Sequence, residues 1–491
     1  MSLLYKYKTD TAPHKTVRLK TENSVYGGSI NMNRLLKIKK IFFLYVIFVI
    51  CIAAAGCGGS GKSSSKTDTT APDEVTLTAA TITDTSISFT WTNPSDTDFN
   101  HVKMTWTKDG VDAGSSETTD KTITTYSISG LTASSEYSVT VKAADSSGNE
   151  TASIVTVSTL SSGSKDYSFI YTTAELYAVN SALSGNYILM ADLDLSSYNT
   201  GTGWTPIGNN TTYFTGVFEG NNHVIKNLYI NDSSNSYKGL FGYTSGAKIS
   251  NLGLDSVNVS GGNFTGGLVG VNESSAITDC YATGTVTGSW IIGGLAGYNN
   301  SSTITDCYTT GTVKGSSDNT GGLVGWNKSS TITDCYATGA VTGSGWYTGG
   351  LVGDSNYSST ITDCYATGVV TGNVCTGGLV GVNDSSTITD CYATGAVTGS
   401  SDTGGLTGYT SGTITSCYYD STTTGMSDNG YGTPRTTAQM KLQDVDTYIN
   451  TTIYIGWDFV EETTNGSDDV WSIDTTGTIN NGYPYLTNLV P

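Results

Sequence analysis

Three residue types that could do chemistry recur together between residues 266 and 418: an aspartate, then a cysteine, then a tyrosine. The aspartates are Asp279, Asp306, Asp334, Asp363 and Asp390, and Ser416 takes the sixth place. Such carboxylates could bind calcium, which prefers oxygen ligands, or each could accept backbone N–H groups in its own turn. Two of them could also hydrolyse a glycosidic bond, but a near-identical column gives no reason for the pKa values of one pair to differ. The aspartates therefore predict turns, with a calcium site as the alternative.

The cysteines that follow the aspartates occupy equivalent positions in the repeat. They are Cys280, Cys307, Cys335, Cys364, Cys391 and Cys417. If the repeats stack, these side chains run parallel about 4.8 Å apart and do not face one another. We therefore expect a row of buried free thiols that act as small apolar residues, with disulfide pairing as the alternative. Cys375 lies outside the row and is expected to be partly exposed.

The tyrosines next to the cysteines should point outward, because successive strand residues face opposite sides. They are Tyr281, Tyr308, Tyr336, Tyr365, Tyr392 and Tyr418. Trp290, Trp326 and Trp346 lie close to the edges of the repeats. Stacked aromatic rings on an acidic, threonine-rich surface could bind sugar rings or a partner protein. Alternatively, the rings only pack on each other and shield the strands.

The aspartates, cysteines and tyrosines all belong to a sequence repeat of about 28 residues that occurs six times. In the first copy this repeat contains GGLVGVN, AITDCYATG and VTG. Each copy contains short runs rich in Val, Ile, Thr and Tyr, separated by Gly, Asn, Ser and Asp, which is typical of strands. A unit this short cannot bury its apolar side alone, so copies must stack as a parallel β-solenoid. We expect a corner at Thr278 and Asp279, and the double glycine fits either a positive φ or a close backbone approach.

This sequence repeat resembles the GLUG motif of bacterial surface proteins. The resemblance implies a right-handed parallel β-helix and a cell-surface setting, and it implies no reaction. Some proteins with this motif are IgA-cleaving metallopeptidases, whose zinc site needs HExxH. None of the three histidines, His14, His101 and His223, is followed by Glu, so that activity is excluded. Two weaker coils, around Phe218 and Leu240, precede the six copies.

Residues 1–56 read as a signal peptide with its expected start at Met32, since basic residues precede an apolar run over 41–55. The sequence AAGC that ends at Cys57 resembles the lipobox of bacterial lipoproteins. That resemblance implies that Cys57 carries a lipid and anchors the mature chain in a bilayer. The alternative is an ordinary signal peptide with a chance cysteine. Residues 57–71 are rich in Ser, Gly and Lys and are expected to form a flexible tether.

Residues 72–160 are predicted to form an immunoglobulin-like β-sandwich, from runs of strand-forming residues separated by turn residues. Trp91 in an early strand and Leu131 six residues before Tyr137 resemble a fibronectin type III module. The resemblance implies that Tyr137 forms a tyrosine corner by hydrogen bonding to the backbone near the turn. Ala133 departs from the family, which often has proline there.

The repeats are expected to be enclosed by capping segments. Residues 165–212 contain a capping box at Thr172 and should form an N-terminal cap with the first coil. Residues 213–420 are the GLUG-repeat β-helix, and residues 421–491 are predicted to be a C-terminal cap with a second capping box at Thr436. Such caps protect the open strand edges at the ends of a solenoid.

Charge and composition narrow the function. The formal net charge is −19, and without residues 1–56 it is −26, from 14 basic and 40 acidic residues, so the surface should repel nucleic acid and anionic membranes. Lys314 and Lys328 are the only cations between residues 266 and 419, which argues against a β-helical lyase. The sequence therefore predicts an all-β, non-catalytic surface lipoprotein without cofactor, an adhesin that binds a glycan or a host or matrix protein. The alternatives are a purely structural envelope protein and, third, a polysaccharide-active β-helix enzyme.

Overall fold

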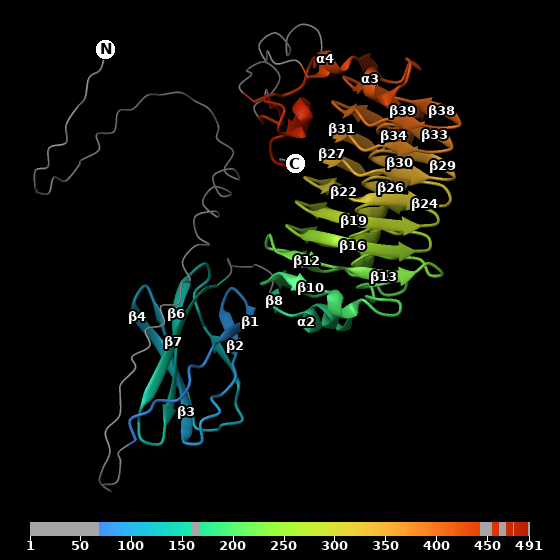
Figure 1. The fold of residues 1–491 in the computed structure, drawn as a ribbon. Helices are drawn as coiled ribbons and strands as arrows, with labels where there is room; N and C mark the ends of the chain where they lie inside the picture. Colours follow the sequence, from blue (N-terminus) through green and yellow to red (C-terminus); the bar gives the residue numbers. More distant parts are fainter. Residues whose placement is uncertain (1–67, 160–166, 442–453, 461–467, 475, 490–491) are drawn as a thin grey trace, which may run out of the picture. The chain divides into compact units, whose positions relative to one another are not determined.

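The protein is known from a computed structural model, which describes residues 68–159, 167–441, 454–460, 468–474 and 476–489. The expected signal peptide, Cys57 and most of the tether lie outside the described residues. Figure 1 shows that the described chain is almost entirely strand, with short helices at the ends of the repeats.

The N-terminal part of the described chain is an antiparallel sandwich with its own core. One sheet contains β1 (Thr78–Ile82), β2 (Ser86–Thr90) and β5 (Thr125–Ser129). The other has the order β4-β3-β6-β7, with β3 (Phe99–Lys108), β4 (Val111–Thr118), β6 (Glu136–Asp145) and β7 (Glu150–Ser158). Alternate residues such as Ile87, Val139 and Val141 are fully buried, as half-buried strands require. The hydroxyl of Tyr137 accepts a hydrogen bond from the backbone N–H of Thr132 at 2.9 Å, so the expected tyrosine corner is confirmed.

The chain enters the solenoid through strands of irregular length. These elements are β8 (Tyr167–Ile170), α2 (Thr173–Ala178), β9 (Asn186–Leu189), β10 (Leu193–Asp194), β11 (Val217–Glu219), β12 (Val224–Lys226) and β13 (Tyr229–Asp232), with 3-10 turns at Val179–Ser181 and Ser196–Tyr198. Helix α2 begins at the predicted capping box, in which the Thr172 side chain accepts from the backbone of Glu175 and the Glu175 side chain accepts from the backbone of Thr172. Leu176 of this helix is fully buried in the solenoid core.

The long side of the solenoid is a parallel ladder. Its strands are β15 (Lys248–Ser250), β16 (Gly253–Gly261), β18 (Ala276–Thr278), β19 (Tyr281–Gly288), β22 (Thr303–Thr305), β23 (Tyr308–Thr309), β24 (Thr312–Gly315), β27 (Thr331–Ala337), β28 (Val341–Gly343), β31 (Thr360–Ala366), β32 (Val370–Thr371), β35 (Thr387–Thr389), β36 (Tyr392–Ala393), β37 (Val397–Thr398), β40 (Thr413–Thr415), β41 (Tyr418–Asp420) and β42 (Thr433–Arg435). The register pairs residues one repeat apart, for example Cys335 with Cys364. The predicted parallel stacking is therefore confirmed.

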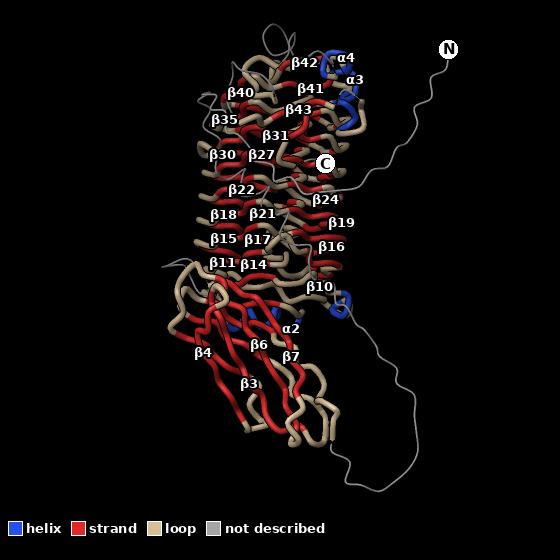
Figure 2. The backbone as a smooth tube through the Cα atoms, turned by 90° about the vertical axis from the view of Figure 1, so that its left-hand side faces the viewer, coloured by secondary structure: helices blue, strands red, loops and turns tan. Residues whose placement is uncertain are grey.

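Two further parallel sheets complete each turn, and Figure 2 shows the strands stacked as successive rungs. The seven-stranded sheet contains β14 (Phe241–Ser245), β17 (Val269–Glu273), β21 (Ala296–Asn300), β26 (Val324–Lys328), β30 (Val352–Asn356), β34 (Val380–Asn383) and β39 (Thr407–Thr410). The five-stranded sheet contains β20 (Ile292–Gly293), β25 (Thr320–Gly321), β29 (Trp346–Gly349), β33 (Val374–Gly377) and β38 (Ser401–Gly404). Leucine, isoleucine and cysteine rows fill the interior between the sheets, with residues such as Leu323 and Ile332 fully buried.

Two backbone features explain the repeated corners. Asp279 has φ +53°, and the equivalent aspartates and Ser416 have φ between +50° and +53°, so the predicted corner is a left-handed residue. Asparagine and aspartate tolerate this region better than most residues, and Asn251 occupies the same corner one coil earlier with φ +53°. The double glycine serves close approach: a Cβ on Gly322 would lie 2.0 Å from the carbonyl oxygen of Gly350.

The C-terminal segment closes the solenoid and then returns along its side. It contains α3 (Ser421–Thr424), α4 (Thr437–Met440), β43 (Trp471–Ile473), a 3-10 turn at Asn480–Gly482 and β44 (Pro484–Leu486). The predicted capping box at Thr436 and Gln439 is present. In Figure 1 the last residues, drawn in red, lie beside β27 and β31. We call the described residues 454–460, 468–474 and 476–489 the C-terminal strap.

Candidate functional site

The six predicted tyrosines lie in one column, which we call the tyrosine ladder, and the first five form a continuous stack of rings. Ring centroids are 4.9 Å apart between Tyr281 and Tyr308, and 4.8 Å apart at the next two steps. Tyr365 and Tyr392 are 5.1 Å apart, and these four pairs of rings are within 10° of parallel. The in-register parallel strands impose this arrangement, because equivalent side chains must lie one above another.

Of the two interpretations of the ladder, an exposed binding platform or rings that pack on each other, the first does not fit four of its six rings. Tyr336, Tyr365, Tyr392 and Tyr418 are at most 4% exposed, because the strap packs on them. The cluster also contains Met440, which precedes the strap, and six residues of the strap itself: Tyr454, Trp457, Phe459, Trp471, Tyr483 and Leu486. Only Tyr281 and Tyr308 remain partly exposed. The ladder is therefore mainly a seam that holds the C-terminal segment. This arrangement is close to the alternative interpretation, in which the rings pack on each other and shield the strands.

Polar contacts fix the strap on the ladder. The hydroxyl of Tyr392 donates to the carbonyl oxygen of Pro484 at 2.5 Å, and Nδ2 of Asn480 donates to the Tyr392 hydroxyl at 2.6 Å. Nε1 of Trp457 donates to the carbonyl oxygen of Ser416 at 2.9 Å. These bonds satisfy polar atoms that the aromatic cluster would otherwise bury without partners.

The aspartate column lies partly beneath the same strap, which changes its electrostatics. Burial is the main cause that raises the pKa of Asp334 to about 7, with Asp363, Asp306 and Asp468 adding repulsion. Burial, followed by Asp363, raises the pKa of Asp390 to about 7. Burial also raises the pKa of Asp363, although Nε1 of Trp471 donates to its Oδ1 at 3.0 Å and opposes the rise. The carboxyls beside the strap, those of Asp334, Asp363 and Asp390, therefore have raised pKa values. The expectation that a near-identical column gives no reason for its pKa values to differ is wrong.

The structure does not gather the aspartate column into a calcium site. Within the described residues, the acidic, histidine or cysteine side chains that approach one another within 4.8 Å in a group of three are Asp68, Asp98 and Asp145, in the sandwich. The parallel stack instead keeps equivalent aspartates one coil apart. Asp145 is engaged locally, since its Oδ1 accepts from the backbone N–H of Ser147 and Asn149 at 2.8 Å.

The six cysteines form the expected inward row of free thiols, each at most 2% exposed. Their sulfurs lie near backbone carbonyl oxygens, as in Cys335, whose Sγ is 3.0 Å from the carbonyl oxygen of Thr333. Burial raises the pKa of the Cys280 and Cys307 thiols well above the usual range. These thiols therefore act as packing residues. Cys375 is free and partly exposed, as predicted.

A second set of aromatic residues, absent from the expected site apart from two tryptophans, lies over the seven-stranded sheet. We call it the aromatic strip: Tyr213, Tyr237, Tyr243, Phe264, Trp290, Tyr298 and Trp326. Its ring centroids are linked by distances from 4.6 Å, between Tyr213 and Tyr243, to 6.3 Å, between Trp290 and Trp326. Tyr237 and Phe264 stack at 5.2 Å and 5°. All seven side chains remain partly exposed, and Tyr213 is 40% exposed.

Two columns of the fold build the strip. The first is the outward position three residues after each GGL leucine, where the register aligns Tyr298 of β21 with Trp326 of β26. The second is a left-handed turn position, with φ +64° at Tyr237 and +55° at Phe264. Reading the leucine-plus-three position through the repeats would have shown Tyr243, Tyr298 and Trp326. The signal was missed because this position does not keep one residue type.

Polar groups border the strip. The Tyr243 hydroxyl donates to a carboxylate oxygen of Glu273, and burial, followed by this bond, raises the pKa of Tyr243. Asp354 follows Trp326 in the strand register and is only 6% exposed; its Oδ2 accepts from Nδ2 of Asn319 at 3.3 Å. Oδ1 of Asp354 and Nε1 of Trp326 have no hydrogen-bond partner among the described residues. Nζ of Lys328 lies 5.6 Å from the Trp326 ring.

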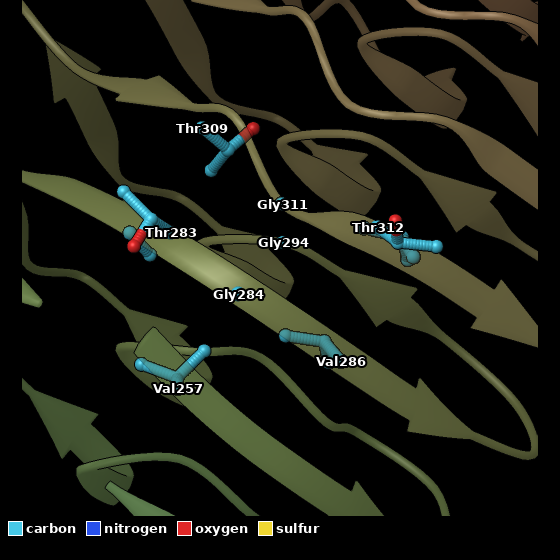
Figure 3. Close-up of a pocket in the computed structure, with 10 residues that line it drawn as sticks. Val257, Thr283, Gly284, Val286, Gly294, Thr309, Gly311 and Thr312 are labelled. Carbon is cyan, nitrogen blue, oxygen red and sulfur yellow. The ribbon is translucent and has the colours of Figure 1, made fainter. Parts of the chain in front are cut away.

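The structure also contains a narrow crevice between coils, shown in Figure 3, which has no room for a water molecule. It lies where Gly284, with φ +111°, passes close to Val257. Its lining is apolar residues, threonines and glycines: Val257, Ala282, Thr283, Gly284, Val286, Gly294, Thr309, Gly311, Thr312 and Val313. Because no titratable side chain lines it, the crevice offers no acid or base for catalysis.

The fold defines a parallel β-solenoid protein with an N-terminal antiparallel β-sandwich. Residues 70–159 match the fibronectin type III domain. Five repeats match the GLUG motif, at residues 261–287, 288–314, 316–342, 344–371 and 372–398. The sixth copy, around Leu406 and Cys417, lies outside these matches but forms a coil in the structure. No helix of the described residues has the length and apolar character to span a membrane.

Similar proteins share parts of this chain. Halomucin of Haloquadratum walsbyi is 38% identical over 128 residues, 24% of this chain and 1% of halomucin. The "Putative Gly-rich membrane protein" of Evansella cellulosilytica is 35% identical over 120 residues, 22% of this chain and 14% of that protein. The chain thus spans only a small part of the length of these relatives. A crystal structure of a "putative immunoglobulin A1 protease" from Bacteroides ovatus is 22% identical with a TM-score of 0.45, covering 65% of this chain and 92% of that one.

Proposed function

We propose that this chain is a non-catalytic binding protein of the bacterial cell envelope, an adhesin that contacts a glycan or a host or matrix protein through the aromatic strip. The observation that carries the proposal is the strip itself, a continuous run of seven partly exposed rings. Exposed aromatic clusters of this kind are typical of interaction sites, because they offer apolar contact area at low cost in side-chain entropy. The tyrosine ladder, in contrast, is already largely occupied by the strap.

The setting of the protein supports this role. Fibronectin type III and GLUG modules are of extracellular type, and the names of the relatives refer to a mucin-like and a membrane protein. We propose in addition that Cys57 is lipid-modified and holds the chain on a bilayer. Replacing Cys57→Ala should release the protein from the membrane fraction. Unchanged membrane partition of that variant would rule out the anchor.

The absence of catalysis is part of the proposal. The carboxyls with raised pKa values, such as Asp334 and Asp390, would be the natural candidates for acid or base chemistry. They lie beside the strap and are half-buried, which restricts the approach of a substrate. A purely structural envelope protein is the runner-up and a polysaccharide-active enzyme comes third. Turnover of a polysaccharide by the purified chain would favour the enzyme.

Binding arrays test the proposal. The chain should be applied to glycan and matrix-protein arrays beside the variant Trp290→Ala/Trp326→Ala, which removes two rings of the strip. A matched control is Tyr409→Ala, because Tyr409 stands in the same strand position as Tyr298 but is not linked to the strip by ring contacts. We expect binding that the double variant loses and the control keeps. No binding by the parent chain, or equal binding by all three proteins, would favour the structural role.

A further inference from the structure

We infer that the aromatic strip binds a neutral, linear glycan that lies along the solenoid axis with about one sugar ring per coil. This inference rests on the proposed function and specifies the ligand of the same site. The strip crosses successive coils, with Tyr243 on β14, Tyr298 on β21 and Trp326 on β26. In the coil of β17 the strand position holds the buried Val271, and the ring of Phe264 continues the strip there. Its ligand must therefore present similar groups at the spacing of the coils, about 4.8 Å.

A linear glycan meets this requirement better than an extended peptide. Sugar rings in such a chain repeat at about the coil spacing, and each ring has an apolar C–H face that packs on an aromatic ring. An extended peptide presents side chains to one face only at every second residue, about 6.6 to 6.8 Å apart. Six ring contacts of the strip join adjacent coils. Four of them, from 4.6 to 5.4 Å, are closer to the spacing of the sugars, and the other two, at 6.0 and 6.3 Å, are closer to that of the peptide.

Charge indicates that the glycan is neutral. The chain has a formal net charge of −19, and the Glu273 carboxylate borders the strip directly. Uronate or sulfate groups would be repelled by this field. Neutral hydroxyls, in contrast, can both donate and accept hydrogen bonds at the polar border.

The end of the strip contains two buried polar atoms without a hydrogen-bond partner among the described residues. Oδ1 of Asp354, a residue that is 94% buried, and Nε1 of Trp326 both have no hydrogen-bond partner among the described residues. Such atoms are uncommon in folded proteins, because leaving them unpaired costs free energy. They come from register-paired positions on the adjacent strands β26 and β30, so both belong to the same end of the strip.

A chain-length series tests the inference on the full chain. Neutral oligosaccharides of one linkage, from two to eight sugars, are titrated by calorimetry beside uronate-containing chains of equal length. We expect affinity to rise up to about five sugars, the number of coils that the strip crosses, and then to level off. Tyr298→Ala should weaken binding about 10-fold or more, as loss of a central aromatic contact does, while Tyr409→Ala leaves it unchanged. Salt should have little effect on a neutral ligand.

Each other outcome contradicts the inference. Preference for uronate-containing chains, affinity that does not depend on length, or equal loss in Tyr409→Ala would overturn it. If Tyr298→Ala does not fold, judged by its melting curve, Trp290→Ala replaces it. If a protein or a branched glycan binds through the strip while the linear series does not, this inference fails and the proposed function stands. If no ligand of the arrays or the series depends on the strip, both fail.

Discussion

Replacing Asp334→Asn should tighten the C-terminal strap at pH 8 and have only a small effect at pH 4. Asp334 has a pKa of about 7, raised mainly by burial beside the strap, and its neighbours Asp363, Asp306 and Asp468 are acidic too. The cations near this seam are Arg435, over the Tyr418 ring at 5.5 Å, and Lys441, over the Tyr483 ring at 4.4 Å. Neither forms an ion pair with Asp334 that would offset the cost of its charge.

The sign of the effect follows from proton linkage. Well below pH 4 the carboxyl of Asp334 is protonated whether or not the strap is docked, so it carries no penalty. At pH 4 the undocked carboxyl, with its ordinary pKa of 3.8, has begun to ionise, and the penalty is about 0.6 kcal/mol. As the pH rises towards 7, the carboxyl ionises more readily in the undocked state, and docking loses up to about 1.4 kcal/mol per pH unit. A shift of about 3 pKa units gives an upper value of about 4 kcal/mol. Partial solvent access and relaxation reduce this, and we expect about 1 to 3 kcal/mol.

Hydrogen exchange measures the docking directly. The backbone N–H of Trp471 donates to Asp458 at 2.8 Å and that of Val460 donates to Trp471 at 2.9 Å, so both report on the strap. Each variant is compared with the parent chain at the same pH, because intrinsic exchange itself depends on pH. Asp279→Asn is the matched control, with the same corner and φ +53° but next to the partly exposed Tyr281. Equal protection in Asp334→Asn and the parent chain at pH 8, or an equal gain at pH 4, would refute the reasoning.

Three further predictions concern the core and the seam. The row cysteines should not react with a polar thiol reagent in the folded chain and should all react after unfolding, since they are free and buried; a titration with no reactive thiols in denaturant would contradict this. Gly350→Ala should destabilise the solenoid by more than about 2 kcal/mol in denaturant melts, because its Cβ would lie 2.1 Å from the carbonyl oxygen of Gly378, whereas Gly425→Ala at an open turn should cost less. Tyr392→Phe should weaken strap docking by about 1 to 2 kcal/mol, because the hydrogen bond to the carbonyl oxygen of Pro484 is lost. The measurement is faster hydrogen exchange at the backbone N–H of Trp471. An unchanged rate would show that the aromatic packing alone holds the strap.

The repeated part of the fold could be predicted because each copy tests the assignment made for the others. Six aligned cysteines indicated an inward row, and the structure places all six there. The parity break between Ile277 and Cys280 indicated a corner, which is the left-handed Asp279. The capping boxes at Thr172 and Thr436 also could be predicted, because they depend on local spacing alone.

The position of the strap on the solenoid could not be predicted, because its contacts join residues that are distant in sequence and each contact occurs only once. Trp471 lies 108 residues from Asp363, to which it donates a hydrogen bond, and Tyr392 lies 92 residues from Pro484. The aromatics at the end of the chain indicated a cap for the end of the solenoid. They pack instead on its side, because the apolar tyrosine ladder is already there.

A regular repeat makes several surface columns at once, and the segments outside the repeat decide which of them stays available. The tyrosine ladder has the more regular sequence, since it keeps one residue type through six coils, and it is the column that the strap covers. Uniformity suits a seam, because a single type of contact can be made at each level. The strand column of the aromatic strip changes from Tyr243 to Val271, Tyr298 and Trp326 along the coils, and variation of this kind suits a ligand whose contacts differ along its length. Regular columns in such solenoids are therefore first candidates for internal packing, and irregular, partly exposed columns are first candidates for binding.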